Sequence, residues 1–61
     1  MSGTELRARR GGLGLSQEEL ARAIGVTSTS VSRWERARQP IPHWLPWRLD
    51  QLELAEQTGV A

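Results

Sequence analysis

Arginine and hydroxyl side chains are the residues of this sequence most able to carry chemistry. The positive charge of the side chains comes from eight arginines, because the chain contains no lysine. A guanidinium group can form paired hydrogen bonds with a phosphate group or with the edge of a guanine. A genome rich in G and C would produce the same preference for arginine, so the composition alone does not identify a ligand.

The residues that metal and catalytic sites need are missing. The chain contains no cysteine, which excludes disulfides and thiolate metal sites. His43 is the single histidine and cannot bind a metal without several carboxylates around it, so we interpret it as a surface or capping residue. No combination of serine, histidine and acid suggests a catalytic triad. We therefore expect no enzyme activity, no metal and no cofactor.

Positive charge is concentrated in the first part of the chain. Residues 1–38 carry seven arginines and four glutamates, a balance of +3, whereas residues 39–61 carry one arginine against one aspartate and two glutamates, a balance of −2.

A chain of 61 residues is expected to form one domain, residues 1–61, with a small core. No apolar run approaches the ~20 residues of a membrane span and no signal-peptide core is present, so we expect a cytoplasmic protein.

The basic part contains a stretch, residues 16–36, that predicts two short helices joined by a tight turn. Ser16 and Glu19 have the spacing of a capping box, so a helix should begin here. Gly25 can adopt the left-handed conformation that ends a helix, and Thr27 is a good N-cap for the next helix. We therefore predict two helices, over residues 16–24 and 27–36.

The apolar residues of this stretch fit two helices that cross at a steep angle. Ala21 stands where two such helices come closest, because a larger side chain there would hold them apart. The other apolar side chains repeat at helical spacing and are expected in the core: Leu20, Ile24, Val26, Val31 and Trp34.

A further helix is expected before this stretch. Ser2 and Glu5 stand at capping-box spacing, and Thr4 is an equally good N-cap, so a helix should cover residues 3–10 with Leu6 facing the core. We expect three glycines to break this helix and to form the loop that follows: Gly11, Gly12 and Gly14.

The last helix is predicted over residues 43–57. Pro40 and Pro42 favour a loop before it, and Pro46 must lie in its first turn. One apolar stripe of this helix should close the core: Leu45, Leu49 and Leu52. A second stripe lies on another side: Trp44, Trp47, Leu54 and Ala55. The tryptophans of the second stripe either wrap around a small core or form a dimer interface, and we favour the dimer interface.

The stretch and its flanks resemble the helix-turn-helix of phage repressors, the lambda-repressor-like or XRE type. The resemblance runs from LRARR through GLSQEELARAIGV to SRWERARQP, about two-thirds of the chain. It implies an all-α bundle of about four helices, shortened by about one helix relative to many members. It also implies a bacterial or phage-encoded protein that binds double-stranded DNA, and we expect a dimeric repressor that reads a pseudo-palindromic operator.

The resemblance implies roles for individual residues. In this family the second helix of the unit enters the major groove and the first crosses the phosphate backbone. Base contacts are then implied for four residues: Thr27, Ser28, Thr29 and Arg33. Phosphate contacts are implied for four more: Gln17, Ser30, Arg36 and Arg38. Many members carry amides where this chain has Ser28 and Thr29, and that departure leaves the target sequence open.

Alternative roles are open to several of these residues. Arg33 could contact a phosphate in place of a guanine, or it could be a solvated surface residue. Gln17 is also simply a good helix former. Arg36 and Arg38 could stabilise the C-terminal end of their helix without touching DNA. Ser32 is interpreted as a plain residue of the helix surface.

Arg10 and Glu35 stand at the positions where similar repressors have an interhelical salt bridge. We interpret them as this structural pair, whereas Arg7 and Arg9 should be solvated, with Arg9 or Arg10 near a phosphate as an alternative.

Two other functions remain open. The chain could be an antitoxin-type regulator, or a protein-interaction module, that binds a protein partner through the side bearing Trp44 and Trp47.

Overall fold

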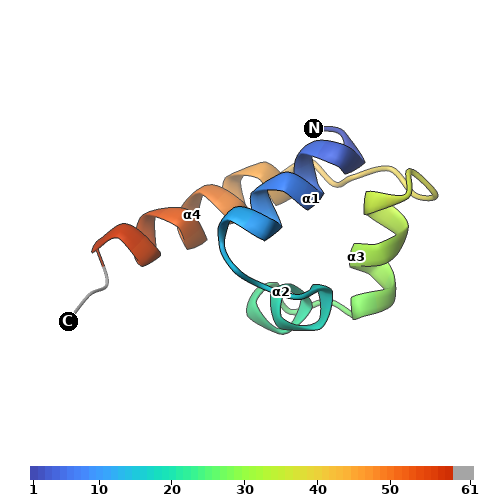
Figure 1. Cartoon of the computed structure of the whole chain (residues 1–61). Helices are drawn as coiled ribbons and strands as arrows, with labels where there is room; N and C mark the ends of the chain where they lie inside the picture. The colour runs from blue at the N-terminus through green and yellow to red at the C-terminus, as the bar shows by residue number, and fades with distance from the viewer. Residues whose placement is uncertain (59–61) are drawn as a thin grey trace.

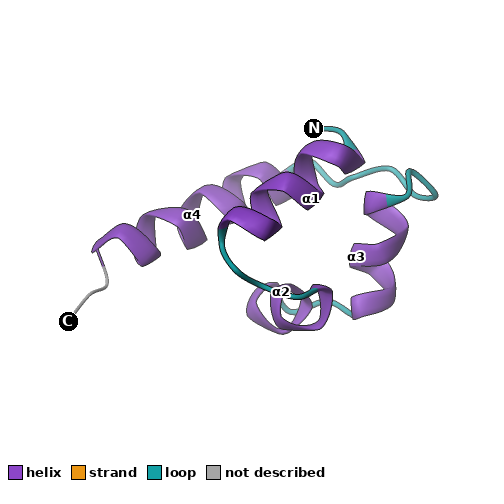
Figure 2. Ribbon diagram, viewed as in Figure 1, coloured by secondary structure: helices purple, strands orange, loops and turns teal. Residues whose placement is uncertain are grey.

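Four helices make up the structure, a computed structural model that describes residues 1–58 and their side chains as far as residue 55. The helices are α1 (Gly3–Gly12), α2 (Gln17–Ile24), α3 (Ser28–Glu35) and α4 (Trp44–Thr58). No strand occurs among the described residues. In Figure 1, α4 passes behind α1 and extends beyond the other helices, while α2 and α3 pack below and beside them. The ribbon of Figure 2 confirms the predicted all-α bundle.

Both helices of the central unit are capped as the sequence predicted. The Ser16 hydroxyl accepts a hydrogen bond from the Glu19 backbone N–H (3.1 Å), and the Glu19 carboxylate accepts one from the Ser16 N–H (2.8 Å). Gly25 ends α2 in the left-handed conformation, with φ of 79°. The Thr27 hydroxyl accepts from the Ser30 N–H (3.2 Å) and begins α3. The caps therefore fix where each helix begins.

The prediction for α1 is partly wrong. Its N-cap is Ser2, whose hydroxyl accepts from the Glu5 N–H (3.0 Å), and not Thr4. The helix runs through Gly11 and Gly12, which were expected to break it, because the Leu13 N–H still donates to the Arg9 and Arg10 carbonyls (both 3.1 Å). These bonds outweigh the low helix propensity of glycine, about 1 kcal/mol per residue. The chain turns instead at Gly14, where φ is 72°.

The last helix begins at Trp44, between Pro42 and Pro46 as predicted, and ends at Thr58, one residue beyond the predicted end. None of the described helices has the length and apolar composition that crossing a membrane requires. All four helices contribute to the core, which confirms most of the predicted set: Leu6, Leu20, Ala21, Val31, Trp34, Leu45 and Leu49. The predicted core residues Ile24, Val26 and Leu52 are half-buried and pack against this cluster.

The N-terminal end of α1 lies directly against the C-terminal end of α3. A methyl group added at Gly3 would come within 2.5 Å of the Glu35 carbonyl oxygen and 2.6 Å of the Trp34 carbonyl oxygen. Such distances are far shorter than a normal contact, so only glycine fits at this position. This contact holds the end of α3 in place from outside the two-helix unit.

Arg9 joins α1 to α4, so the expectation that it is solvated is wrong. Its guanidinium donates to both carboxylate oxygens of Glu53 (2.9 Å each) and to the Asp50 carboxylate. The pKa of Glu53 is held below its ordinary value, chiefly by the hydrogen bonds from Arg9. On another side of α4, Arg48 donates to the Ala23 carbonyl (3.3 Å) at the end of α2. Both contacts anchor α4 to the rest of the bundle.

Candidate nucleic-acid interface

The outer side of α3 is built by residues opposite its buried side. Val31 and Trp34 point into the core, with 0% and 7% of their surface exposed. Thr29 and Arg33 are both exposed and lie one helical turn apart, which places them on one side of the helix. The structure therefore brings these two predicted base-contacting residues together, away from the core.

The other two predicted base-contacting residues are placed differently. The Thr27 hydroxyl is already engaged, because it accepts from the Ser30 N–H and donates to the Ser30 hydroxyl (3.1 Å). Ser28 is half-buried and lines a shallow hollow between α2 and α3 together with Glu18 and Arg22. Both residues thus stand at the start of α3, beside α2, where their hydroxyls are less available than that of Thr29.

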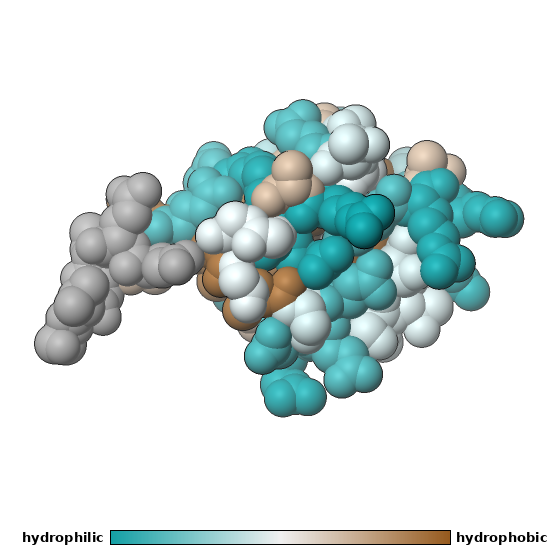
Figure 3. Space-filling model, in the orientation of Figure 1, coloured by the Kyte–Doolittle hydropathy of each residue, from teal (hydrophilic) through white to brown (hydrophobic). Residues whose placement is uncertain are grey.

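Three arginines gather where α3 ends. Arg33, Arg36 and Arg38 line a hollow of about 530 Å³, together with Ser32 and Gln39. Within the described side chains, no carboxylate forms an ion pair with any of these arginines. Figure 3 shows hydrophilic side chains projecting at this end of the molecule, where α3 runs into the following loop. The predicted phosphate-contacting residues Arg36 and Arg38 are therefore adjacent to Arg33 and open to solvent.

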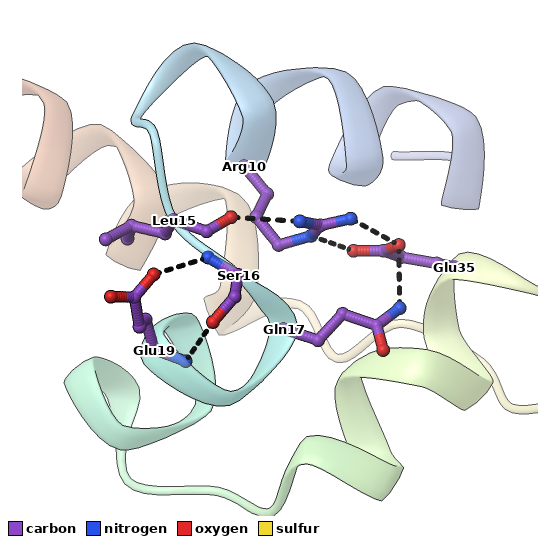
Figure 4. Close-up of polar contacts among 6 residues, drawn as sticks. All are labelled: Arg10, Leu15, Ser16, Gln17, Glu19 and Glu35. Carbon is purple, nitrogen blue, oxygen red and sulfur yellow. Dashed lines mark hydrogen bonds and ion pairs between the residues drawn. The ribbon is translucent and has the colours of Figure 1, made fainter.

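Gln17 and Glu35 connect the two helices of the unit. The Gln17 amide donates to one oxygen of the Glu35 carboxylate (3.1 Å). Arg10 donates to both oxygens of the same carboxylate (2.6 and 3.2 Å) and to the Leu15 carbonyl (2.9 Å). The ion pair expected between Arg10 and Glu35 is thus present, and Figure 4 shows it together with the capping box at Ser16. The end of α1, the start of α2 and the end of α3 meet at one carboxylate.

The Glu35 carboxylate is charged in spite of its burial. Only 5% of its side chain is exposed. Burial raises the pKa of Glu35, but the hydrogen bonds from Arg10 and Gln17 outweigh this effect and hold the pKa below its ordinary value. The same contact with Glu35 raises the pKa of Arg10. An ionised carboxylate therefore fixes the start of α2 relative to α3.

Another hollow, of about 260 Å³, surrounds this network. It is lined by Arg7, Arg10, Gln17, Glu35 and Arg36, so Arg36 lines both this hollow and the hollow of about 530 Å³ at the end of α3. Arg7 is exposed, as expected for a solvated residue, and it lines this hollow together with the predicted phosphate-contacting residue Gln17. Its position three residues before Arg10, on the same side of a helix, could have indicated this from the sequence. Three arginines against one carboxylate leave this hollow positive.

The sequence model of a family described as a helix-turn-helix domain matches residues 3–60. The chain belongs to the helix-turn-helix family, in its lambda-repressor-like type. Searches of curated proteins and of solved structures found no significant match. This membership implies binding to DNA. The two helices that the sequence predicted for the motif correspond to α2 and α3, which are joined by the turn at Gly25.

The apolar side of the last helix in this helix-turn-helix domain is divided. Trp44 packs edge-on against Trp34, with 6.1 Å between ring centroids and an interplanar angle of 83°. Trp47 and Leu54 are each 61% exposed, against 43% for Trp44. Trp44 thus belongs partly to the edge of the core, whereas Trp47 and Leu54 form an exposed stripe two turns apart.

Metal-ligating side chains do not gather in the part of the helix-turn-helix chain that the structure describes. No group of three or more His, Cys, Asp or Glu side chains there could hold an ion. His43 is exposed at the start of α4.

Proposed function

We propose that this helix-turn-helix chain is a sequence-specific regulator of transcription that binds double-stranded DNA as a homodimer and acts as a repressor in the cytoplasm. The observation that carries the proposal is the exposed outer side of α3, which bears Thr29 and Arg33. Arg33 also lines the hollow of about 530 Å³ at the end of this helix. A helix of this kind can enter the major groove of DNA, whose base edges carry a distinct pattern of donors and acceptors.

Arg33 is the proposed reader of a guanine. Its exposed guanidinium can donate to O6 and N7 of the base at the same time, which discriminates by about 1–3 kcal/mol against other bases. Thr29, one turn earlier, can place its methyl group against a thymine methyl or hydrogen-bond to a base. Thr27 and Ser28 are proposed to contact the groove from the start of the helix, with smaller effects because one is engaged in the cap and the other is half-buried.

Phosphate contacts are proposed on both sides of the groove. Gln17 donates one of its two amide hydrogens to Glu35, which leaves the second for a phosphate oxygen. Ser30, Arg36 and Arg38 supply the other proposed contacts, at the beginning and beyond the end of α3. The pair of Arg10 with Glu35 holds Gln17 in position and does not itself need to touch DNA.

The exposed stripe of Trp47 and Leu54 is the proposed dimer interface, with Trp44 at its edge. Two copies would present their α3 helices about one turn of DNA apart, ~34 Å, and would therefore read a pseudo-palindrome. A dimer seated over a promoter blocks the polymerase without needing any further surface. This is why repression is proposed over activation.

Selection of bound duplexes from a random DNA library by the purified protein, at near-physiological salt, tests this function. We expect enrichment of a two-fold symmetric motif that contains a guanine in each half-site. Binding without enrichment, abolished by moderate salt, would contradict sequence-specific regulation. It would favour the alternative in which the Trp44 and Trp47 side binds a protein partner, as in an antitoxin-type regulator.

A further inference from the structure

A hollow of about 440 Å³ opens between the start of α1 and the loop that follows α3. Figure 1 shows this loop, in yellow, leaving the end of α3 and passing the start of α1. The hollow shares only Arg38 and Gln39 with the hollow of about 530 Å³ at the end of α3. Its volume lies in the range of small-molecule sites, about 300–1,000 Å³.

Apolar side chains form most of the wall of this hollow. They come from the segment before α1, from α3 and from the loop: Met1, Trp34, Ala37, Pro40 and Ile41. Trp34 is 7% exposed, and Ile41 is half-buried against the core. An aromatic ring or a branched hydrocarbon chain that entered the hollow would therefore exchange water for apolar contacts, which favours binding.

Backbone contacts hold both edges of the hollow in place. At one edge, Gly3 lies so close to the end of α3 that an added methyl group would come within 2.6 Å of the Trp34 carbonyl oxygen. At the other edge, the Arg38 N–H donates to the Arg33 carbonyl (2.8 Å), and the Ala37 N–H donates to the Trp34 carbonyl (3.2 Å). The hollow is thus formed before any ligand arrives, which lowers the entropic cost of binding.

The polar side chains of the lining include one cation and no carboxylate. Arg38 is exposed and forms no ion pair with any described carboxylate. The other two polar side chains of the lining, those of Gln39 and Ser2, are neutral and can donate hydrogen bonds. The Ser2 hydroxyl accepts from the Glu5 N–H and so retains its own hydrogen. A guanidinium group in such surroundings favours a carboxylate, to which it can donate two parallel hydrogen bonds.

We propose that this hollow binds a small carboxylic acid with an aromatic or branched aliphatic body. The body lies against Trp34 and Pro40, and the carboxylate pairs with Arg38. The consequence for DNA rests on the proposed function, in which Arg38 contacts a phosphate of the duplex. A guanidinium that holds the acid is withdrawn from that phosphate. The hollow is therefore an effector site, at which the acid weakens the binding of the regulator to DNA.

Titration of the free protein with naphthoate, followed by NMR of the indole N–H signals, tests the site in the absence of DNA. We expect a saturable shift of the Trp34 signal and no shift of the Trp47 signal, because Trp47 does not line the hollow. Acetate at equal ionic strength, which lacks the apolar body, should shift neither signal. A shift confined to Trp47, or no saturable shift of Trp34, would overturn the proposal.

Two comparisons test the pairing of the carboxylate with Arg38. The uncharged naphthamide should bind about tenfold more weakly than naphthoate, and Arg38→Gln should weaken naphthoate binding by a similar factor, the loss of a charge-assisted hydrogen bond. Arg22→Gln removes the same charge from an exposed position on α2 and should leave naphthoate binding unchanged. Equal binding of naphthoate and naphthamide, or equal effects of the two substitutions, would overturn the proposal.

Competition with duplex DNA tests the effector role. Saturating naphthoate should lower the duplex affinity of the unaltered chain about tenfold, and the duplex should lower naphthoate affinity by the same factor. The duplex affinity of Arg38→Gln should not respond to naphthoate. Naphthoate binding at Trp34 that leaves duplex affinity unchanged would overturn the effector role.

The same measurements separate this site from the proposed function. Naphthoate binding by a chain that binds no duplex would support the site and overturn the proposed function. Duplex binding by a chain that does not bind naphthoate would overturn the site and leave the proposed function standing.

Discussion

Glu35 keeps its negative charge with only 5% of its side chain exposed, because Arg10 and Gln17 together donate to both of its oxygens. A buried carboxylate without such partners would be strongly destabilising. The role of this residue could be expected from the resemblance to repressors, which places an acid at this position. The hydrogen bond from Gln17 to Glu35 could not be expected from the sequence, because it depends on the angle at which α2 meets α3.

Stability should therefore depend on pH through Glu35. Its pKa in the folded chain lies below the ordinary value of 4.5, so its contribution is complete above about pH 5 and is lost as the pH falls through the folded-state value. Glu35→Gln should lower the free energy of unfolding by about 2 kcal/mol at pH 7 and by less at pH 3, where protonation removes part of the contribution of the carboxylate. Urea unfolding at both pH values measures the difference.

Glu18→Gln is the matched control for this measurement. Glu18 is exposed at the start of α2, so its substitution should change the free energy of unfolding by less than about 0.5 kcal/mol. An equal loss of stability from Glu35→Gln at pH 7 and at pH 3 would show that packing, and not the ionised carboxylate, is what matters at this position.

Arg9 shows why other contacts could not be predicted from the sequence. It lies 44 residues from Glu53, and nothing in either local sequence indicates that the two meet. The pairing arises only when α1 and α4 pack side by side. A local pattern therefore predicted a solvated arginine where the fold has an interhelical ion pair.

The beginnings of the helices were predicted better than their ends. Ser2, Ser16 and Thr27 are N-caps whose hydroxyls bond within three residues, so the signal is local and visible in the sequence. The end of α1 was misplaced because backbone hydrogen bonds carried the helix through two glycines. The end of α3 is a Schellman motif, in which the Arg38 N–H donates to the Arg33 carbonyl (2.8 Å) and the Ala37 N–H to the Trp34 carbonyl (3.2 Å). It was missed because Ala37, with φ of 58°, occupies the left-handed position where glycine is the usual signal.

Ala37→Gly should stabilise the protein. The left-handed conformation costs a residue with a Cβ atom about 1–2 kcal/mol, whereas glycine gains about 0.4–1 kcal/mol of entropy in the unfolded chain. The relief of strain exceeds this entropy, so we expect the free energy of unfolding to rise by about 0.5–1 kcal/mol, measured by urea or thermal unfolding. Ala23→Gly, at an exposed position inside α2, should lower it by about 1 kcal/mol. A similar decrease in the free energy of unfolding from Ala37→Gly would show that the backbone of Ala37 is not strained.

The bundle as a whole has a small core and one apolar stripe left exposed. The sequence could not decide whether the second stripe of α4 completes the core or faces another molecule, because a helical pattern does not show how far neighbouring helices reach. The structure divides the stripe, with Trp44 against Trp34 and with Trp47 and Leu54 exposed. Large exposed apolar side chains of this kind are typical of interfaces.

The proposed dimer predicts a dependence on Trp47. Sedimentation equilibrium should find a dimer for the unaltered chain and a monomer for Trp47→Glu, because the carboxylate would be buried without a partner at the interface. The same substitution should weaken binding to a duplex with two half-sites at least about tenfold and leave binding to one half-site unchanged. Ala8→Glu, which adds the same charge at an exposed position on α1, should change neither property. A monomeric unaltered chain at concentrations that saturate DNA would contradict the dimer.

The reading of a guanine by Arg33 is best tested by a double-mutant cycle on a duplex obtained by selection. Affinities would be measured for the unaltered chain and Arg33→Ala, each with the guanine-containing duplex and with a duplex in which that base pair is exchanged. We expect Arg33→Ala to bind the guanine-containing duplex about 10–100-fold more weakly than the unaltered chain does. Exchanging the base pair should then lower the affinity of Arg33→Ala only slightly further. An equal loss on both duplexes would show that Arg33 contacts only the backbone, and α3 would not read this base through it.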